Sequence, residues 1–457
     1  MADEAFTLRE INWREAFPFT HLFRAFRVAI HPSKLIIALL ALICLWGGGK
    51  VLDAVWPSKY QPVANELTTT PSMRLPIAQE RLGEYLREMR MLEGREPAVD
   101  APVGHVGVFH TFFTFEVVQA NNVLMFRGGL YEAFESIWQF VAVGPLWLWS
   151  THWFFALLYT AWFLLIWSIF GGAISRIAAV HVARDEKISV RHAVSFSVSK
   201  VLSFICAPII PVLIILIVGV IIAAAASILL HIPYIGPPIA AAFFFLALLG
   251  GFIITLVLLG TLGGFNLMYP TIAVEGSDSF DAISRSFSYV FARPWRMLFY
   301  TLISVIYGGV CYLFVRFFVW MVLAVTWFFM TWFLGPHGQP AKYFPMMWPQ
   351  PTDPLRTLTY TPVYESLKGS ETFAAGLMSL YVYLVIGLVG AFAISFYFSA
   401  NTLIYYLMRR EVDATDLDDV YVEEMDDEIP ETEAPPVITE VTPAVVEGAS
   451  DAPPASA

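Results

Sequence analysis

The sequence predicts an all-α membrane protein with about six transmembrane helices. Of its 457 residues, 57% are hydrophobic and only 14% are charged, whereas soluble proteins carry about 25% charged residues. Several apolar runs reach the ~18–20 residues needed to cross a hydrocarbon core. A large soluble α-protein with buried helices is the alternative, but this chain has too few charged residues to cover a water-facing surface.

Six apolar segments account for the predicted spans. They are residues 35–55, about 153–174, about 201–230, about 239–262, a run that starts at 297, and about 373–399. Around them the chain divides into an N-terminal cytoplasmic segment (1–34), an extracytoplasmic region (56–150), a main membrane domain (151–410) with an outer loop (335–372), and a tail (411–457). In the extracytoplasmic region, residues 76–92 predict a polar-faced helix, and residues 104–126 predict a segment that lies on the membrane or caps the bundle.

Lys and Arg in the connections predict the orientation. They are frequent before the first span and after the second, fourth and sixth spans, whereas HIPYIGPP between the third and fourth spans has none. Since short cytoplasmic loops are enriched in Lys and Arg, both termini are predicted to be cytoplasmic, in a cell (inner) membrane.

An amphipathic helix is predicted at about 278–293, before the fifth span. At 100° per residue, its large apolar side chains share one face and its charged side chains the other. The apolar face contains Phe280, Ile283, Phe287, Val290 and Phe291, and the charged face contains Asp281, Arg285, Arg293 and Arg296. Such a helix lies in the membrane interface. Pro294 suits the first turn of the span that follows.

Two further segments resemble this amphipathic helix, and their similarity predicts three repeats. Before the first span, Leu22, Phe26 and Ile30 lie opposite Arg24 and Arg27, and Pro32 marks the turn into the span. A degraded third copy, ISVRHAVSFSVSKVLSF, precedes the third span. Each predicted repeat is an interfacial helix followed by a two-span hairpin; chance similarity among apolar segments is the alternative.

The basic residues of these helices are the predicted contacts with anionic lipid headgroups, and two prolines mark the turns into the spans. The headgroup residues are Arg24, Arg27, His31, Lys34, Arg285, Arg293 and Arg296, and the turn residues are Pro32 and Pro294. Near an anionic surface each basic residue contributes about 1 kcal/mol. The alternative is that the arginines pair with acidic groups of the protein, such as Asp278, Asp281 or the tail.

Arg316 is a candidate functional residue because it lies inside an apolar run. It follows Met297 by ~20 residues, which places it near the outer interface, where a long side chain can snorkel to water. The sequence favours this position, with residues 317–333 continuing as an interfacial or re-entrant segment.

Small residues and prolines in the spans predict packing rather than chemistry. The pairs Gly260/Gly264 and Gly387/Ala391 match the small-xxx-small pattern of close helix contact. Pro208 and Pro211 predict a kinked third span.

No metal, cofactor or catalytic motif stands out in the sequence. His105 and His110 with Glu116 are candidate ligands, but their spacing puts the histidines on different helix faces, so no metal site is predicted. The three cysteines lie far apart in apolar runs, and no nucleotide-binding, hydrolase or metalloprotease motif is present. The sequence therefore predicts no cofactor and no enzyme.

The tail explains the net charge of −11. Residues 411–457 contain 15 of the 38 Asp and Glu and no Lys or Arg, which leaves 23 acidic and 27 basic residues, or +4, elsewhere. Acidic and rich in Pro, the tail is predicted to be disordered. It is not suited to nucleic acid; a protein partner for it is the alternative to a solubilising role.

Two segments, FGGAISRIAAVHVARDEKISV and AVEGSDSFDAISRSFSYVFARPWRMLFYTLISVIYGGVCYLFVRFF, resemble a family of uncharacterised multi-pass bacterial inner-membrane proteins. The resemblance covers roughly residues 150 to 330 and implies location and topology only. The layout is loosely similar to the membrane domain of some glycerophosphodiester phosphodiesterases, but their catalytic domain is absent. We therefore expect a non-enzymatic scaffold that interacts with lipids or proteins; a transporter or permease-like subunit is the alternative.

Overall fold

The computed structural model is helical throughout the spans and confirms the predicted fold class. It describes residues 17–62, 67, 107–125, 128–332, 339–351, 360, 362–364 and 367–421. Within these residues six helices are long and apolar enough to cross a membrane. They are α3 (Pro32–Val55), the continuous helix formed by α9 (Trp153–Ile166), η5 (Trp167–Gly171) and α10 (Gly172–Arg184), α12 (Val201–Leu230), α14 (Phe244–Glu275), α16 (Pro294–Trp332) and α18 (Ser370–Val412).

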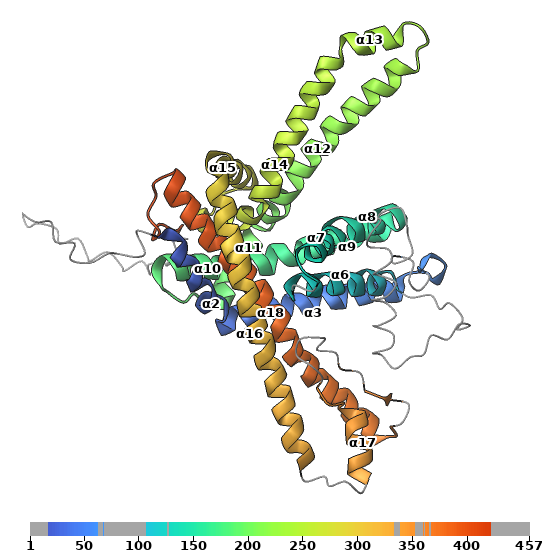
Figure 1. Ribbon diagram of the computed structural model, residues 1–457, viewed down its shortest axis with the longest axis vertical. Coiled ribbons are helices and arrows are strands. Elements are labelled where there is room, and N and C mark those ends of the chain that lie inside the picture. The colour runs from blue at the N-terminus through green and yellow to red at the C-terminus, as the bar shows by residue number, and fades with distance from the viewer. Residues whose placement is uncertain are drawn as a thin grey trace, which may run out of the picture. The chain divides into compact units, whose positions relative to one another are not determined.

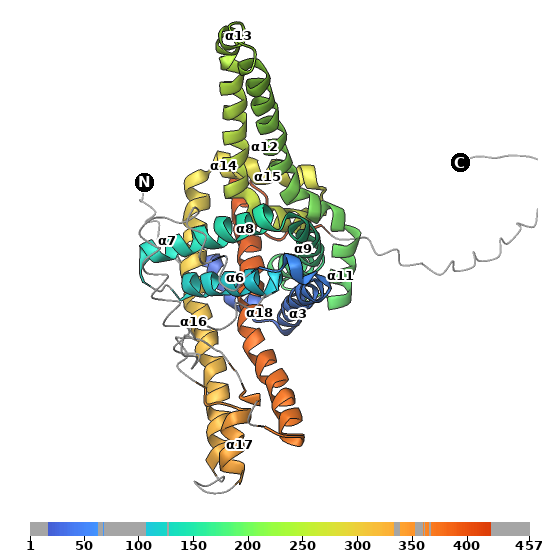
Figure 2. The ribbon, with the colours of Figure 1, turned by 90° about the vertical axis from the view of Figure 1, so that its right-hand side faces the viewer.

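The six spans form three antiparallel hairpins, α3 with α9, α12 with α14, and α16 with α18. The hairpins diverge from one common end (Figures 1 and 2). A short helical segment precedes the first span of each hairpin: η1 and α2 (Pro18–Phe23 and Arg24–Ala29), α11 (Val190–Ser199) and α15 (Ser279–Ala292). This is the predicted arrangement of three repeats.

The short helices join the hairpins in a closed ring. Each packs on the second span of the preceding hairpin, so α11 contacts α10, α15 contacts α14, and α2 contacts α18. The ends of α10, α14 and α18 also contact one another. We call this assembly the hub: α2, α10, α11, α15, and the last turns of α14 and α18 (residues 267–275 and 400–412).

Small residues on the second spans permit the close approach of the short helices. A Cβ added to Gly172 would lie 2.7 Å from the Ser197 Oγ of α11. At Gly264 it would lie 3.2 Å from the Ser286 Cβ and 3.3 Å from backbone atoms of α15, and at Gly260 2.7 Å from the Phe287 ring. In the third contact Ser395 Oγ of α18 donates a hydrogen bond of 2.7 Å to the Ala29 carbonyl. Gly260 and Gly264 therefore face α15 rather than another span.

α15 buries a stripe of small or polar side chains at this close contact. Ala282, Ser286 and Tyr289 form the stripe, whereas Phe280 and Phe291 of the predicted apolar face are 68% and 49% exposed. In the first repeat, Ile30 is 44% exposed. The reason is steric, because the glycine-lined surface of α14 accepts a face with small side chains and leaves Phe280 and Phe291 uncovered by protein.

The third hairpin is longer than a bilayer requires. α16 has 39 residues and α18 has 43, or about 58 and 64 Å at 1.5 Å per residue, against a hydrocarbon core of about 30 Å. The interfacial or re-entrant segment predicted for 317–333 is wrong, since α16 runs unbroken through Arg316 to Trp332. Between the two spans, α17 (Gln339–Met347) forms part of the outer loop, and Trp327 Nε1 donates to the Trp348 carbonyl at 3.1 Å.

The described part of the region between α3 and α9 contains η2 (Ser58–Tyr60), α6 (Val108–Leu124), α7 (Leu130–Trp138), η4 (Gln139–Val143) and α8 (Gly144–Thr151). Asp53 near the end of α3 caps α6, accepting from Phe109 N at 2.7 Å and His110 N at 3.0 Å. The glycines at 47–49 do not interrupt α3. The helix predicted at 76–92 and residues 422–457 of the tail lie outside the described residues.

Candidate functional site: the charged clusters of the hub

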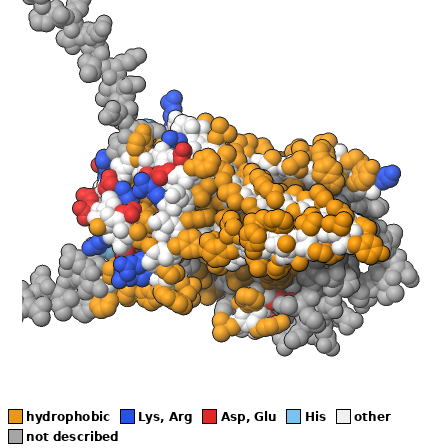
Figure 3. Space-filling model, turned by 90° about the horizontal axis from the view of Figure 1, so that it is seen from above, with side chains coloured by type: hydrophobic (Ala, Val, Ile, Leu, Met, Phe, Trp, Pro, Cys, Tyr) orange, Lys and Arg blue, Asp and Glu red, His pale blue; other side chains and the backbone are white. Residues whose placement is uncertain are grey.

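On the face seen in Figure 3, charged side chains gather at the hub end, and hydrophobic side chains cover most of the rest. The basic connections counted in the sequence, around Arg27, Lys187 and Arg293, all belong to this end. Two separate clusters of charge lie within the hub, and they differ in whether the charges are balanced.

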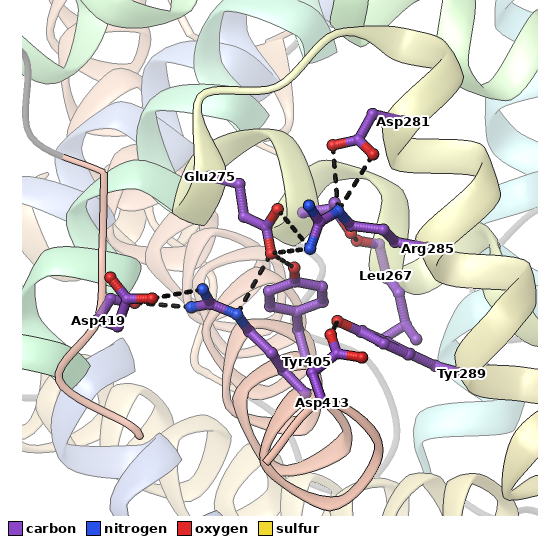
Figure 4. A network of polar contacts seen from close by, with 10 residues as sticks. Leu267, Glu275, Asp281, Arg285, Tyr289, Tyr405, Asp413 and Asp419 are labelled. Carbon is purple, nitrogen blue, oxygen red and sulfur yellow. Dashed lines mark hydrogen bonds and ion pairs between the residues drawn. The ribbon is translucent and has the colours of Figure 1, made fainter. Parts of the chain in front are cut away.

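The first cluster is centred on Glu275, the last residue of α14 (Figure 4). Its carboxylate accepts from Arg285 of α15, with 3.0 Å between Nη1 and Oε2, and from Arg409 of α18, with 3.3 Å between Nε and Oε1. The Tyr405 hydroxyl donates to the same carboxylate. The Glu275 and Arg409 side chains are only 10% and 11% exposed, so one buried acid joins elements of two hairpins.

Further ion pairs extend this cluster along α15 and α18. Arg285 Nε is 3.1 Å from both oxygens of Asp281, and Arg409 Nη2 is 2.6 Å from Asp419 Oδ2. Arg296 pairs with Glu411, and the Tyr289 hydroxyl donates to Asp413. The positive groups of this cluster are thus matched by carboxylates.

These pairs change the interpretation of two predicted headgroup residues. Arg285 and Arg296 each bind carboxylates of the protein, which is the alternative raised by the sequence. Arg293 is exposed, Arg24 is half-buried and Arg27 is exposed. Pro32 and Pro294 are the first residues of α3 and α16, as the turn into each span requires.

The second cluster surrounds Lys34 and is mainly basic. We call it the Lys34 cluster: Lys34 in the first turn of α3, His31 just before it, Arg27 of α2, His181 of α10, and Lys187. Lys34 is 0% exposed, which corrects its predicted place at the headgroups. Its Nζ lies 3.4 Å from Ser399 Oγ of α18.

The histidines of this cluster are close to each other. The His31 and His181 rings meet edge to face, with centroids 6.0 Å apart, and His181 Nε2 lies 3.6 Å from Asp185 Oδ1. Burial lowers the pKa of His31, and the positive charges of Lys34 and Lys187 lower it further. The Asp185 side chain is 64% exposed.

Arg316 lies outside both clusters and is turned into the protein. It is 5% exposed, and its Nη1 donates to Asn121 Oδ1 of α6 at 3.0 Å and to the Tyr312 hydroxyl at 3.2 Å. The predicted snorkelling to the outer interface is therefore wrong. The bond to Asn121 ties the first hairpin's outer segment to α16 of the third hairpin.

The candidate metal ligands do not converge. His105 lies outside the described residues; His110 Nδ1 is 3.5 Å from Lys50 Nζ, while Glu116 lies against Gly144 and Phe112. The described residues contain no group of three or more His, Cys, Asp or Glu that could hold a metal ion. Glu116 is 9% exposed, and burial raises its pKa to about 8.

The remaining predicted packing residues lie where α18 crosses α3. A Cβ added to Gly387 would lie 2.8 Å from the Leu39 Cδ1, and Ala391 is fully buried beside Ile37 and Ala38. Pro208 and Pro211 lie inside α12, which continues as one helix through both.

Glu275, Arg409 and Arg176 are among the buried or nearly buried charges that were not predicted from the sequence. Arg176 is 3% exposed; its Nη1 donates to the Ala273 carbonyl at 2.8 Å, and its guanidinium lies 4.4 Å from the Phe196 ring centroid. All three lie at the ends of spans. Their position in the sequence could have indicated them. Glu275 and Arg409 lie in the last turns of α14 and α18, and Arg176 lies in α10 before a basic connection.

Comparison of the chain with protein-family models, curated proteins and solved structures finds no match.

Proposed function

We propose that this protein is a non-enzymatic scaffold of the cell (inner) membrane that binds anionic lipids and partner proteins. The observation that carries the proposal is the combination of an ion-paired hub with three diverging hairpins. In the most apolar stretches of α12 and α14, 0% and 6% of residues are buried inside the protein. Almost the whole side surface of this hairpin is therefore offered to surrounding lipid or to other membrane helices.

The hub supplies the second part of the proposal, a polar surface at one end of all hairpins. Exposed basic residues such as Arg27, Lys187 and Arg293 border this surface. Basic residues next to spans favour the cytoplasmic side and attract anionic headgroups. We therefore place the hub and both termini in the cytoplasm, with lipid headgroups around the hub. The acidic tail would then be available to a cytoplasmic protein partner.

The proposal is tested on the full-length protein reconstituted in liposomes of phosphatidylcholine and phosphatidylglycerol. We expect native mass spectrometry to find phosphatidylglycerol retained over phosphatidylcholine. We also expect efflux of an entrapped panel of ions, sugars and amino acids to equal that of protein-free liposomes. Solute flux that Pro208→Ala or Gly264→Leu abolishes would instead establish the transporter alternative and overturn the scaffold.

A further inference from the structure

Lys34 lacks the counter-charge that the Glu275 cluster has in excess. An ammonium carries three donors, yet within the described residues Lys34 Nζ makes a single hydrogen bond, at 3.4 Å to the Ser399 hydroxyl. Burial of an ammonium without an anionic partner costs several kcal/mol. The fully buried Lys34 side chain therefore favours any anion that can enter.

The groups around Lys34 add positive charge instead of compensating it. Arg27 and Lys34 are both within electrostatic range of the His181 ring, and Lys34 and Lys187 are within range of His31. The carboxylate of Asp185, which contacts His181, is mostly exposed. The start of α3 contributes a further partial positive charge from the helix dipole.

A second, independent feature indicates a missing hydrogen-bond partner. His31 Nδ1 is buried and has no hydrogen-bond partner in the described structure, although most buried polar side-chain atoms in proteins have one. His31 lies directly before α3, and its ring faces that of His181. A phosphate oxygen within reach of both groups would give His31 Nδ1 a partner and Lys34 an anionic partner.

We propose that the Lys34 cluster is a binding site for a single phosphate group. A phosphate has several acceptor oxygens and a charge of about −1 to −2, which suits the ammonium, imidazole and guanidinium donors of Lys34, His31 and Arg27. It would enter past Arg27 and Lys187, which are exposed, and the flexible stem of Lys34 lets the ammonium turn towards it.

The phosphate belongs either to an anionic phospholipid headgroup or to a free phosphate ion. In the first case the inference deepens the proposed lipid-binding function and rests on it, because basic clusters between membrane helices hold lipid headgroups. The bound lipid would then connect α2, α3 and α10 at the hub. In the second case the site is independent of the scaffold proposal.

The experiment uses the full-length protein in phosphatidylcholine nanodiscs. Inorganic phosphate and short-chain phosphatidylglycerol are titrated separately, and the thermal unfolding midpoint and the ³¹P signal of bound phosphate are recorded. We expect saturable binding of one of the two. A response to phosphate ion identifies the free anion, and a response to phosphatidylglycerol alone identifies the lipid. No saturable response to either overturns the inference.

Lys34→Met keeps the length of the side chain and removes its charge, and we expect it to weaken binding at least tenfold. Arg27→Gln, at the exposed rim, provides a second variant that folds even if Lys34→Met does not. Lys59→Gln is the matched control, because Lys59 is an exposed basic residue outside the hub and outside the cluster. Unchanged binding in a folded Lys34→Met or in Arg27→Gln overturns the site. If phosphatidylglycerol is still retained in that case, the scaffold proposal survives.

Discussion

Arg409 of α18 contacts Glu275 of α14 at the centre of the hub, with 3.3 Å between Nε and Oε1 and both side chains about nine-tenths buried. These residues are in the last turns of the second and third hairpins, which otherwise diverge (Figure 1). The pair therefore fixes how two hairpins meet. Arg285 forms a second ion pair with the same carboxylate, and the Tyr405 hydroxyl donates a hydrogen bond to it (Figure 4).

Removal of one partner should destabilise the protein strongly. We expect Arg409→Met to reduce the free energy of unfolding by about 3–5 kcal/mol, because it leaves the Glu275 carboxylate with less compensation at a buried site. Thermal unfolding in detergent measures the change, and Arg410→Gln is the matched control. The double variant Glu275→Gln/Arg409→Met should recover part of the loss. Equal midpoints for Arg409→Met and Arg410→Gln would contradict the structural role.

Gly264 provides a steric test of the ring of short helices. Gly264→Val would place a Cβ 3.2 Å from Ser286, and the further methyl groups would meet the α15 backbone. We expect a loss of about 1–3 kcal/mol from overpacking. Gly251→Ala on the same helix is the control, since a Cβ there meets nothing within 4 Å. The two-helix contact is refuted if Gly264→Val is as stable as Gly251→Ala.

The bond between Arg316 and Asn121 should couple the first and third hairpins. Hydrogen bonds to charged groups contribute about 1.5–3 kcal/mol. A double-mutant cycle with Arg316→Met and Asn121→Ala, read from unfolding midpoints, should show a coupling of that size. Strictly additive effects would mean that α6 is held by its apolar contacts and by the Asp53 cap alone.

Glu116 should make stability fall as the pH rises. Burial raises its pKa from the ordinary 4.5 to about 8, so between these values the folded state keeps a proton that the unfolded state has lost. Stability is therefore highest below about pH 4.5, declines through the interval and levels off above about 8. Glu116→Gln should remove this decline and be the more stable protein at pH 8. Identical pH profiles for both proteins would show that the carboxyl group is not buried.

The spans and the repeats could be predicted from sequence because they depend on the length and period of apolar runs. The end of the fifth span could not be predicted from sequence. The apolar run continues past Arg316 without a helix-breaking residue, and only the thickness of a bilayer suggested that the helix stops there. The inward position of Arg316 depends on Asn121, a residue remote in sequence whose amide gave no signal of its own.

The partners of the charged residues are likewise only partly predictable from sequence, because several of them are remote in the chain. The pairing of Arg285 with Asp281 is visible as a spacing of four on one helix, but its pairing with Glu275 depends on how α15 returns along α14. Lys34 and Arg285 appear equivalent on a helical projection. The structure separates them, because Arg285 is balanced by two carboxylates, whereas Lys34 is buried without one among the residues that the structure describes.

The central claim is that three hairpins share one hub on the cytoplasmic side of the membrane. Reporter fusions after Arg191, Ser288 and Arg410 at the hub, and after Pro237 at the far end of the second hairpin, test it most directly. The account predicts cytoplasmic signals from the three hub positions and an extracytoplasmic signal from Pro237. A cytoplasmic signal from Pro237 would contradict it.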